Sequence, residues 1–127
     1  MNIKKFSNYS PNILRIGVSL VFLWFGINQV LDPNYFTSYL PDFILNFSNP
    51  VNFVIFNGIF EVIFGILLLL GLFTRLVSII LTLHLLGIIF SLGYNEISVR
   101  DFGLMVSSFV VFLNGKDSWC LDRKLFK

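Results

Sequence analysis

Glu61 is the residue whose position most clearly asks for a chemical explanation. It lies in the middle of an otherwise uncharged run from Val51 to Leu72, which is long enough to cross a lipid bilayer. An acidic side chain at the centre of a membrane-spanning helix costs about 2.5 to 3.5 kcal/mol on insertion scales. Its presence therefore indicates a function, with a structural hydrogen bond to a neighbouring helix as the alternative.

His84 is the titratable residue of the next apolar stretch, Leu76 to Asn95. Glu61 lies about ten residues, or about 15 Å, from the outer end of its helix, and His84 about nine residues, or about 14 Å, from the inner end of the next. Both side chains are thus expected near the midplane, in contact directly or through water. We predict that they form a catalytic pair, with a neutral packing histidine as the alternative reading of His84.

Further polar side chains recur at helical spacing and are predicted to bind a ligand. They are Arg15, Gln29, Asn57, Arg100 and Asp101. Asn57 shares a helical face with Glu61, and Arg15, Phe22 and Gln29 lie seven residues apart along one stripe. Snorkelling to the headgroups is the alternative for Arg15, and an interfacial ion pair at a helix start is the alternative for Arg100 and Asp101.

The composition identifies the elements that must position these residues. With 56% hydrophobic, 17% aromatic and 13% charged residues, the 127-residue chain is too apolar for a water-soluble domain. Four apolar stretches, approximately 11–31, 51–72, 76–93 and 99–114, predict an all-α membrane protein with a single antiparallel four-helix transmembrane bundle. The last stretch is the shortest and carries Arg100 and Asp101 in its first turn. The first stretch is too long for a cleaved signal peptide, so we expect it to be retained.

The basic residues predict the orientation of the bundle. All except Arg100 fall on one side of the four-span arrangement, which places both termini in the cytoplasm. The segment 32–50 then becomes an outer loop or interfacial helix, and residues 115–127 a basic cytoplasmic tail. The aromatic residues of the outer segment suit the headgroup level; they are Tyr35, Phe36, Tyr39, Phe43 and Phe47.

Small and polar residues also predict which helix faces point inward. The expected interior stripes are Asn57, Gly58, Glu61 and Gly65 on the second helix, His84, Gly87 and Ser91 on the third, and Arg100, Gly103 and Ser107 on the fourth. Together they would form a ladder of polar groups across the membrane.

Several kinds of chemistry have no signature in the sequence. The single cysteine, Cys120, excludes an intramolecular disulfide or a Cys-x-x-Cys pair. We find no metal-ligand cluster, haem-type histidine pair, nucleotide loop or nucleophile beside a base, and the scattered charges do not indicate nucleic-acid binding. Two functions without catalysis remain open: a small-solute transporter or channel, and an anchor that recruits a soluble partner through the basic tail.

The order of these residues resembles the DoxX family of small four-helix membrane proteins. The resemblance rests on Arg15-x-Gly17, Phe22 and Gly26, then Glu61-x-x-x-Gly65 running into Leu69-Leu70-Gly71-Leu72-Phe73-Thr74-Arg75, then Arg100-Asp101, and finally Gly115 with Leu121-Asp122. The block from Glu61 to Arg75 is its most specific part. This sequence has Gln29 where many relatives carry lysine.

The resemblance implies a subunit in a prokaryotic cytoplasmic membrane. Some family members are linked to quinone-coupled oxidation of reduced sulfur compounds, and others to membrane oxidoreductase complexes that handle oxidative stress. We therefore expect a quinone as the cofactor, with Glu61, His84 and Arg100 supplying hydrogen bonds and a proton path. The expected partners are the lipid bilayer and soluble or membrane oxidoreductase subunits, and the chain is compatible with a homo-oligomer.

Overall fold

The computed structural model describes residues 3–37, 40, 42, 46, 49–93, 96–117 and 119–121, and in this part of the chain it contains helices and no strand. The helices are α1 (Ile3–Ser7), α2 (Ser10–Leu31), α3 (Pro33–Thr37), α5 (Pro50–Leu70), α6 (Thr74–Leu92) and α7 (Glu96–Asn114). The all-helical prediction is confirmed. Tyr39, Phe43, Phe47 and the residues from Asp122 onward lie outside the described part.

Three of the helices are long and apolar enough to cross a membrane. They are α2, α5 and α6, with mean hydropathies of 1.6, 2.5 and 1.8 over their most apolar windows. The fourth predicted span corresponds to α7, which has 19 residues but begins with Glu96 and also carries Arg100 and Asp101. This polar first half makes α7 less apolar than the other three, and its insertion in the bilayer stays a prediction.

Local sequence signals set the ends of α5. The Asn49 side chain accepts a hydrogen bond from the backbone N–H of Val51 at 3.1 Å, and Pro50 occupies the first helical turn, where its missing N–H costs nothing. Gly71 ends the helix in the left-handed conformation, with φ of 75°. These signals make α5 and α6 antiparallel neighbours joined by a turn of only three residues.

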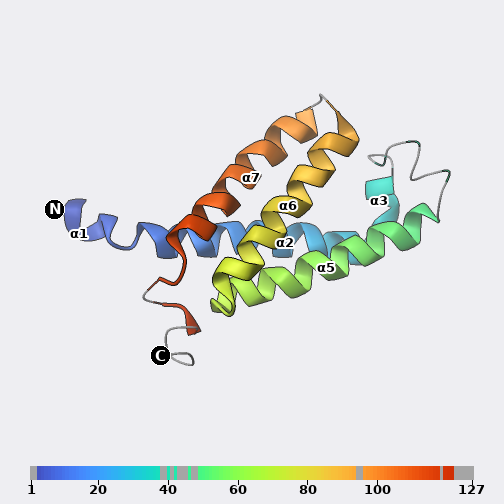
Figure 1. Ribbon diagram of the computed structural model, residues 1–127. Coiled ribbons are helices and arrows are strands. Elements are labelled where there is room, and N and C mark those ends of the chain that lie inside the picture. The colour runs from blue at the N-terminus through green and yellow to red at the C-terminus, as the bar shows by residue number, and fades with distance from the viewer. Residues whose placement is uncertain are drawn as a thin grey trace.

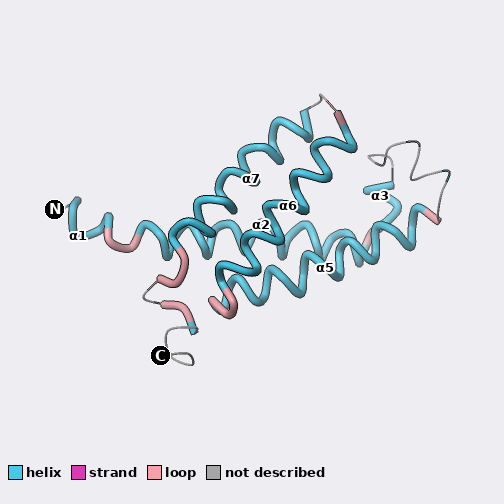
Figure 2. Tube along the Cα trace, in the orientation of Figure 1, coloured by secondary structure: helices cyan, strands magenta, loops and turns pink. Residues whose placement is uncertain are grey.

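The long helices are arranged as two antiparallel pairs (Figures 1 and 2). α2 packs mainly on α5, and α6 mainly on α7. The pair α6–α7 diverges from α2–α5 toward the end of the molecule where α3 lies. A core of Val18, Phe22, Leu68, Val77, Leu81, Leu85 and Val111 joins the two pairs. The divergence matters because it leaves room for a cavity.

Close backbone contact holds α2 against α5. A Cβ atom added to Gly26 would lie 2.8 Å from the carbonyl oxygen of Gly58, and one added to Gly58 would lie 2.8 Å from that of Gly26. Only glycine permits this approach of two helices. The predicted interior face of α5 is thus confirmed, because Gly58, Glu61 and Gly65 are all buried.

The predicted interior face of α7 is wrong. Gly103 is exposed, and a Cβ atom there would meet nothing within 4 Å, while Ser107 bonds to the Gly103 carbonyl at an exposed position. The buried residues of α7 are instead Ser98, Asp101, Ser108 and Val111. α7 has two polar stripes, and packing selects the one that contains Asp101. Arg100 keeps 56% of its side chain exposed.

The described residues at the beginning of the predicted cytoplasmic tail pack against the helices instead of extending away from them. Cys120 is fully buried, and a Cβ atom on Gly71 would lie 2.6 Å from its Cα atom. The rings of Tyr9 and Trp119 stack with their centroids 5.5 Å apart. The described residues after α7 therefore close the end of the bundle formed by the start of α2 and the α5–α6 turn.

Candidate functional site

A cavity of about 660 Å³ lies between the two helix pairs and has walls from α2, α3, α5, α6 and α7. Its walls are rich in aromatic rings: Phe22, Trp24, Phe25, Tyr35, Phe36 and Phe53. Its size is within the range of about 300–1,000 Å³ that is typical of small-molecule sites. The predicted interior stripe of α6 lines this cavity; it consists of His84, Gly87 and Ser91.

Glu61 is the centre of a hydrogen-bond network in the cavity. The Gln29 amide donates to Glu61 Oε2 at 3.0 Å, and the Asn57 amide donates to Glu61 Oε1 at 3.1 Å. Asn57 also donates to Gln29 Oε1 at 2.7 Å, so the two amides hold each other. His84 Nε2 lies 3.4 Å from Glu61 Oε1. The carboxylate is thus held by neutral donors and a histidine.

The helix packing explains why these side chains meet. The glycine contact brings α2 and α5 close enough for Gln29 and Glu61 to bond, and the antiparallel α5–α6 turn brings His84 to the same depth. The Phe60 ring packs on the His84 ring with centroids 4.7 Å apart. The predicted approach of Glu61 and His84 is therefore confirmed, with His84 as the more accessible partner at 19% side-chain exposure against 6%.

Arg100 and Asp101 form a second polar group on the cavity wall. Arg100 Nη2 lies 3.5 Å from Asp101 Oδ1, and the guanidinium carbon lies 4.7 Å from the centre of the Phe25 ring. Asp101 is buried although Arg100 is largely exposed. The cavity therefore brings together six of the seven residues that the sequence singled out, and six ring systems beside them.

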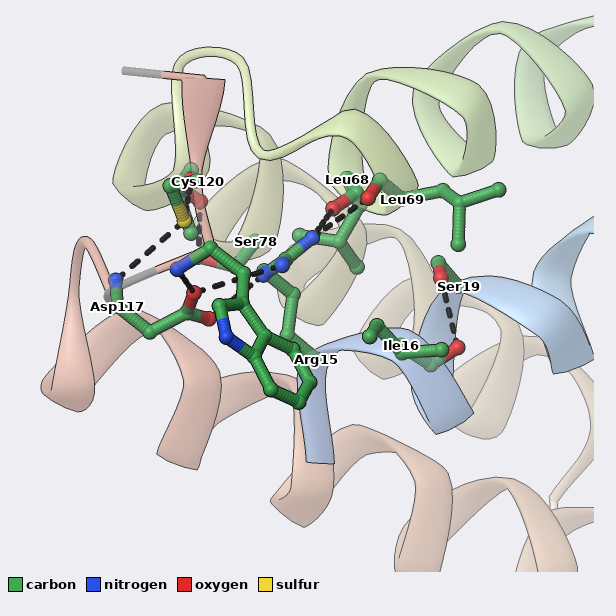
Figure 3. A network of polar contacts seen from close by, with 10 residues as sticks. Arg15, Ile16, Ser19, Leu68, Leu69, Ser78, Asp117 and Cys120 are labelled. Carbon is green, nitrogen blue, oxygen red and sulfur yellow. Dashed lines mark hydrogen bonds and ion pairs between the residues drawn. The ribbon is translucent and has the colours of Figure 1, made fainter. Parts of the chain in front are cut away.

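Arg15 is the seventh of these residues, and it lies in a separate cluster (Figure 3). Its Nε donates to Asp117 Oδ2 at 2.7 Å, and its Nη1 donates to the carbonyl oxygens of Leu68 and Leu69 at 2.8 and 2.6 Å. Both side chains of the ion pair are buried. Arg15 therefore neither snorkels to the headgroups nor lines the cavity, and the apolar core lies between its cluster and Glu61. The predicted polar ladder is divided into two parts.

Asp117 was not anticipated as a partner, because it is 102 residues away from Arg15 in sequence. Burial by itself raises the pKa of this carboxyl group, but hydrogen bonds from Arg15 and the Trp119 backbone, together with the Arg15 charge, outweigh it and hold the pKa below its usual range. Thr74 Oγ1 and the Asp117 backbone N–H contact Cys120 Sγ in the same cluster, at 3.4 and 3.3 Å. The sequence contains one signal for this pair: an arginine buried within an apolar helix, such as Arg15, needs an acidic partner.

Metal binding is not indicated by the described side chains, which include no group of three or more histidine, cysteine, aspartate or glutamate residues placed to hold an ion. What the cavity offers is an apolar, ring-lined space, hydrogen-bond donors, and the adjacent titratable side chains of Glu61 and His84. This combination suits a flat, apolar molecule with polar atoms at its edge.

Comparison with protein families gives a match to the family described as DoxX, over residues 10–93. The matched range runs from the start of α2 to the end of α6 and covers well over half of the 127-residue chain. No curated protein and no solved structure matches. Glu61 and His84 lie inside the matched range, whereas Arg100, Asp101 and Asp117 lie beyond it. The chain is an integral membrane protein and belongs to the DoxX family.

Proposed function

We propose that this protein is the membrane subunit of a quinone-coupled oxidoreductase complex and that its cavity holds the quinone. The observation that carries the proposal is the pairing of Glu61 with His84 in a ring-lined cavity between two helix pairs. A quinone ring needs an apolar space with aromatic contacts, and its carbonyl oxygens need hydrogen-bond donors. The cavity residues meet both requirements.

The residues divide the work according to their exposure and chemistry. His84, the more accessible of the central pair, donates a hydrogen bond to a carbonyl oxygen of the quinone ring. Glu61 exchanges a proton with the quinone. Gln29 and Asn57 already bond to Glu61, so they position the carboxylate rather than the ligand. Arg100 lies on the cavity wall and is a second donor for the ring's other edge.

The redox chemistry itself belongs to the cofactor. When bound, a quinone takes up two electrons and two protons to become a quinol. The electrons must come from another subunit, and the described side chains contribute binding, orientation and protons. This division makes the chain a subunit of a redox complex rather than a self-sufficient enzyme.

Quinone titration of the detergent-purified protein, followed by thermal shift, tests the proposal. We expect saturable stabilisation of the wild type, retained in part by Glu61→Gln and lost in Glu61→Leu. Leucine removes the carboxyl group and leaves the Gln29 amide without its acceptor. Within the assembled complex, Glu61→Gln should impair quinone reduction while leaving the fold intact.

Two other results would replace this proposal. Absence of a shift, combined with solute or ion flux through proteoliposomes, would favour a transporter. Absence of both would favour a membrane anchor.

A further inference from the structure

Among the described residues that line the cavity, acidic side chains outnumber permanently charged basic ones. Glu61 on α5 and Asp101 on α7 are acidic, whereas Arg100 is the permanently charged base among the lining residues. Arg100 is paired with Asp101, and the contacts to Glu61 come from two neutral amides and His84. Of the two carboxyl groups in this described lining, Glu61 is therefore the one that has no arginine or lysine beside it.

The same cavity already holds one cation in a suitable arrangement. The Arg100 guanidinium lies over the Phe25 ring, 4.7 Å from its centre, and beside the Asp101 carboxylate. An aromatic face attracts a cation through its negative quadrupole, more strongly where water is excluded. Glu61 lines the same cavity as the rings of Phe22 and Phe53, and its partner His84 packs on the Phe60 ring. The cavity thus offers aromatic faces and a carboxyl group to a ligand.

We propose that the cavity binds lipophilic cations, that is, onium or ammonium groups carrying apolar substituents, with Glu61 as their counter-ion. Such a ligand supplies the missing positive charge, and its apolar groups occupy the ring-lined walls. An anion of the same shape is repelled by Glu61. The inference goes beyond the quinone proposal and does not depend on it, because it follows from the acidic, basic and aromatic side chains of the described lining alone.

Tetraphenylphosphonium and tetraphenylborate provide a matched pair of probes, because they have the same shape and opposite charge. We expect the purified wild-type protein to bind tetraphenylphosphonium saturably in a calorimetric titration, and tetraphenylborate at least about tenfold more weakly, because a charge about 6 Å from Glu61 interacts strongly in a site of low polarity. Glu61→Gln should weaken phosphonium binding by a similar factor and remove the preference between the two ions.

Arg100→Gln gives an opposite expectation and guards against simple loss of folding. It removes the competing cation and leaves Asp101 available, so phosphonium binding should strengthen several-fold. Ser107→Ala, on the exposed face of α7, is the matched control and should leave the binding of both ions unchanged. Equal binding of both probes by the wild type, or weaker phosphonium binding in Arg100→Gln, would overturn the inference. A separate quinone titration shows whether the quinone proposal fails with it.

Discussion

At the scale of single residues, the buried ion pair between Arg15 and Asp117 ties the two ends of the chain together. Arg15 uses its remaining donors on the carbonyl oxygens of Leu68 and Leu69, near the end of α5. These carbonyls have few partners within their own helix because they belong to its last turn. One arginine therefore joins α2, the end of α5 and the segment after α7.

Asp117→Asn should lower the free energy of unfolding at neutral pH by about 3 kcal/mol, because it leaves the Arg15 charge buried without a counter-charge. The pKa of Asp117 in the folded protein lies below its ordinary value of 3.8. The stabilising effect is therefore complete above pH 3.8 and is lost as the pH falls through the folded-state pKa. Thermal unfolding of wild type and variant across this range measures the effect.

The exposed Asp32, changed to asparagine, is the control for this experiment and should leave the stability at neutral pH nearly unchanged. The difference between wild type and Asp117→Asn should shrink on acidification. A difference of constant size down to pH 2 would show that the Asp117 carboxylate charge does not stabilise the fold.

At the scale of helices, the contact between α2 and α5 depends on Gly26 and Gly58. Gly26→Ala and Gly58→Ala should each separate the two helices and cost about 1–3 kcal/mol, since the added methyl group meets backbone atoms that cannot move independently. The change should also lengthen the bond between Gln29 and Glu61 and so weaken ligand binding. Unfolding in a denaturing detergent and ligand titration measure the two effects.

Gly17→Ala on α2 and Gly87→Ala on α6 are matched controls for the unfolding measurement, because a Cβ atom at either position meets nothing within 4 Å. For the ligand titration Gly17→Ala is the control, since Gly87 lines the cavity. They should be neutral or slightly stabilising, as alanine favours helix more than glycine does. Equal destabilisation by all four substitutions would mean that the α2–α5 contact does not depend on the missing side chains.

Periodicity predicts helices and their polar faces well where one polar stripe stands out, as on α5. It fails on α7, where the stripe of Arg100, Gly103 and Ser107 is as plausible in sequence as the buried stripe that contains Asp101. Choosing between them requires the position of α6, which local sequence does not encode. Likewise, the approach of His84 to Glu61 followed from depth, whereas the pairings of Gln29 with Glu61 and of Arg15 with Asp117 needed the three-dimensional path of the chain.

At the scale of the whole molecule, the described basic residues other than Arg100 lie in α1, the start of α2, the start of α6 and the segment after α7; they are Lys4, Lys5, Arg15, Arg75 and Lys116. These parts of the chain lie toward the same end of the molecule (Figure 1). Arg100 lies toward the opposite end, beside the cavity. This asymmetry predicts that the closed end faces the cytoplasm and the cavity opens on the outer half of the membrane.

Single cysteines test this orientation in a Cys120→Ser background. An impermeant maleimide should label Asn34→Cys on α3 in intact cells, and should label Lys116→Cys only after the cells are opened. Both positions are exposed, whereas native Cys120 is fully buried and a poor reporter. Labelling of Lys116→Cys in intact cells would reverse the orientation.

We propose that the cavity holds a quinone-type molecule, and the most direct test is to identify the lipid-soluble molecules that co-purify with the protein. Gly87→Phe should place a ring in the cavity, because Gly87 lines it and an added Cβ atom there meets nothing within 4 Å. Gly103→Phe is the matched control on the exposed face of α7. Organic extracts of the purified proteins, analysed by mass spectrometry, should contain near-stoichiometric quinone for wild type and Gly103→Phe and little for Gly87→Phe. Equal amounts of quinone in all three, or none in the wild type, would contradict the claim.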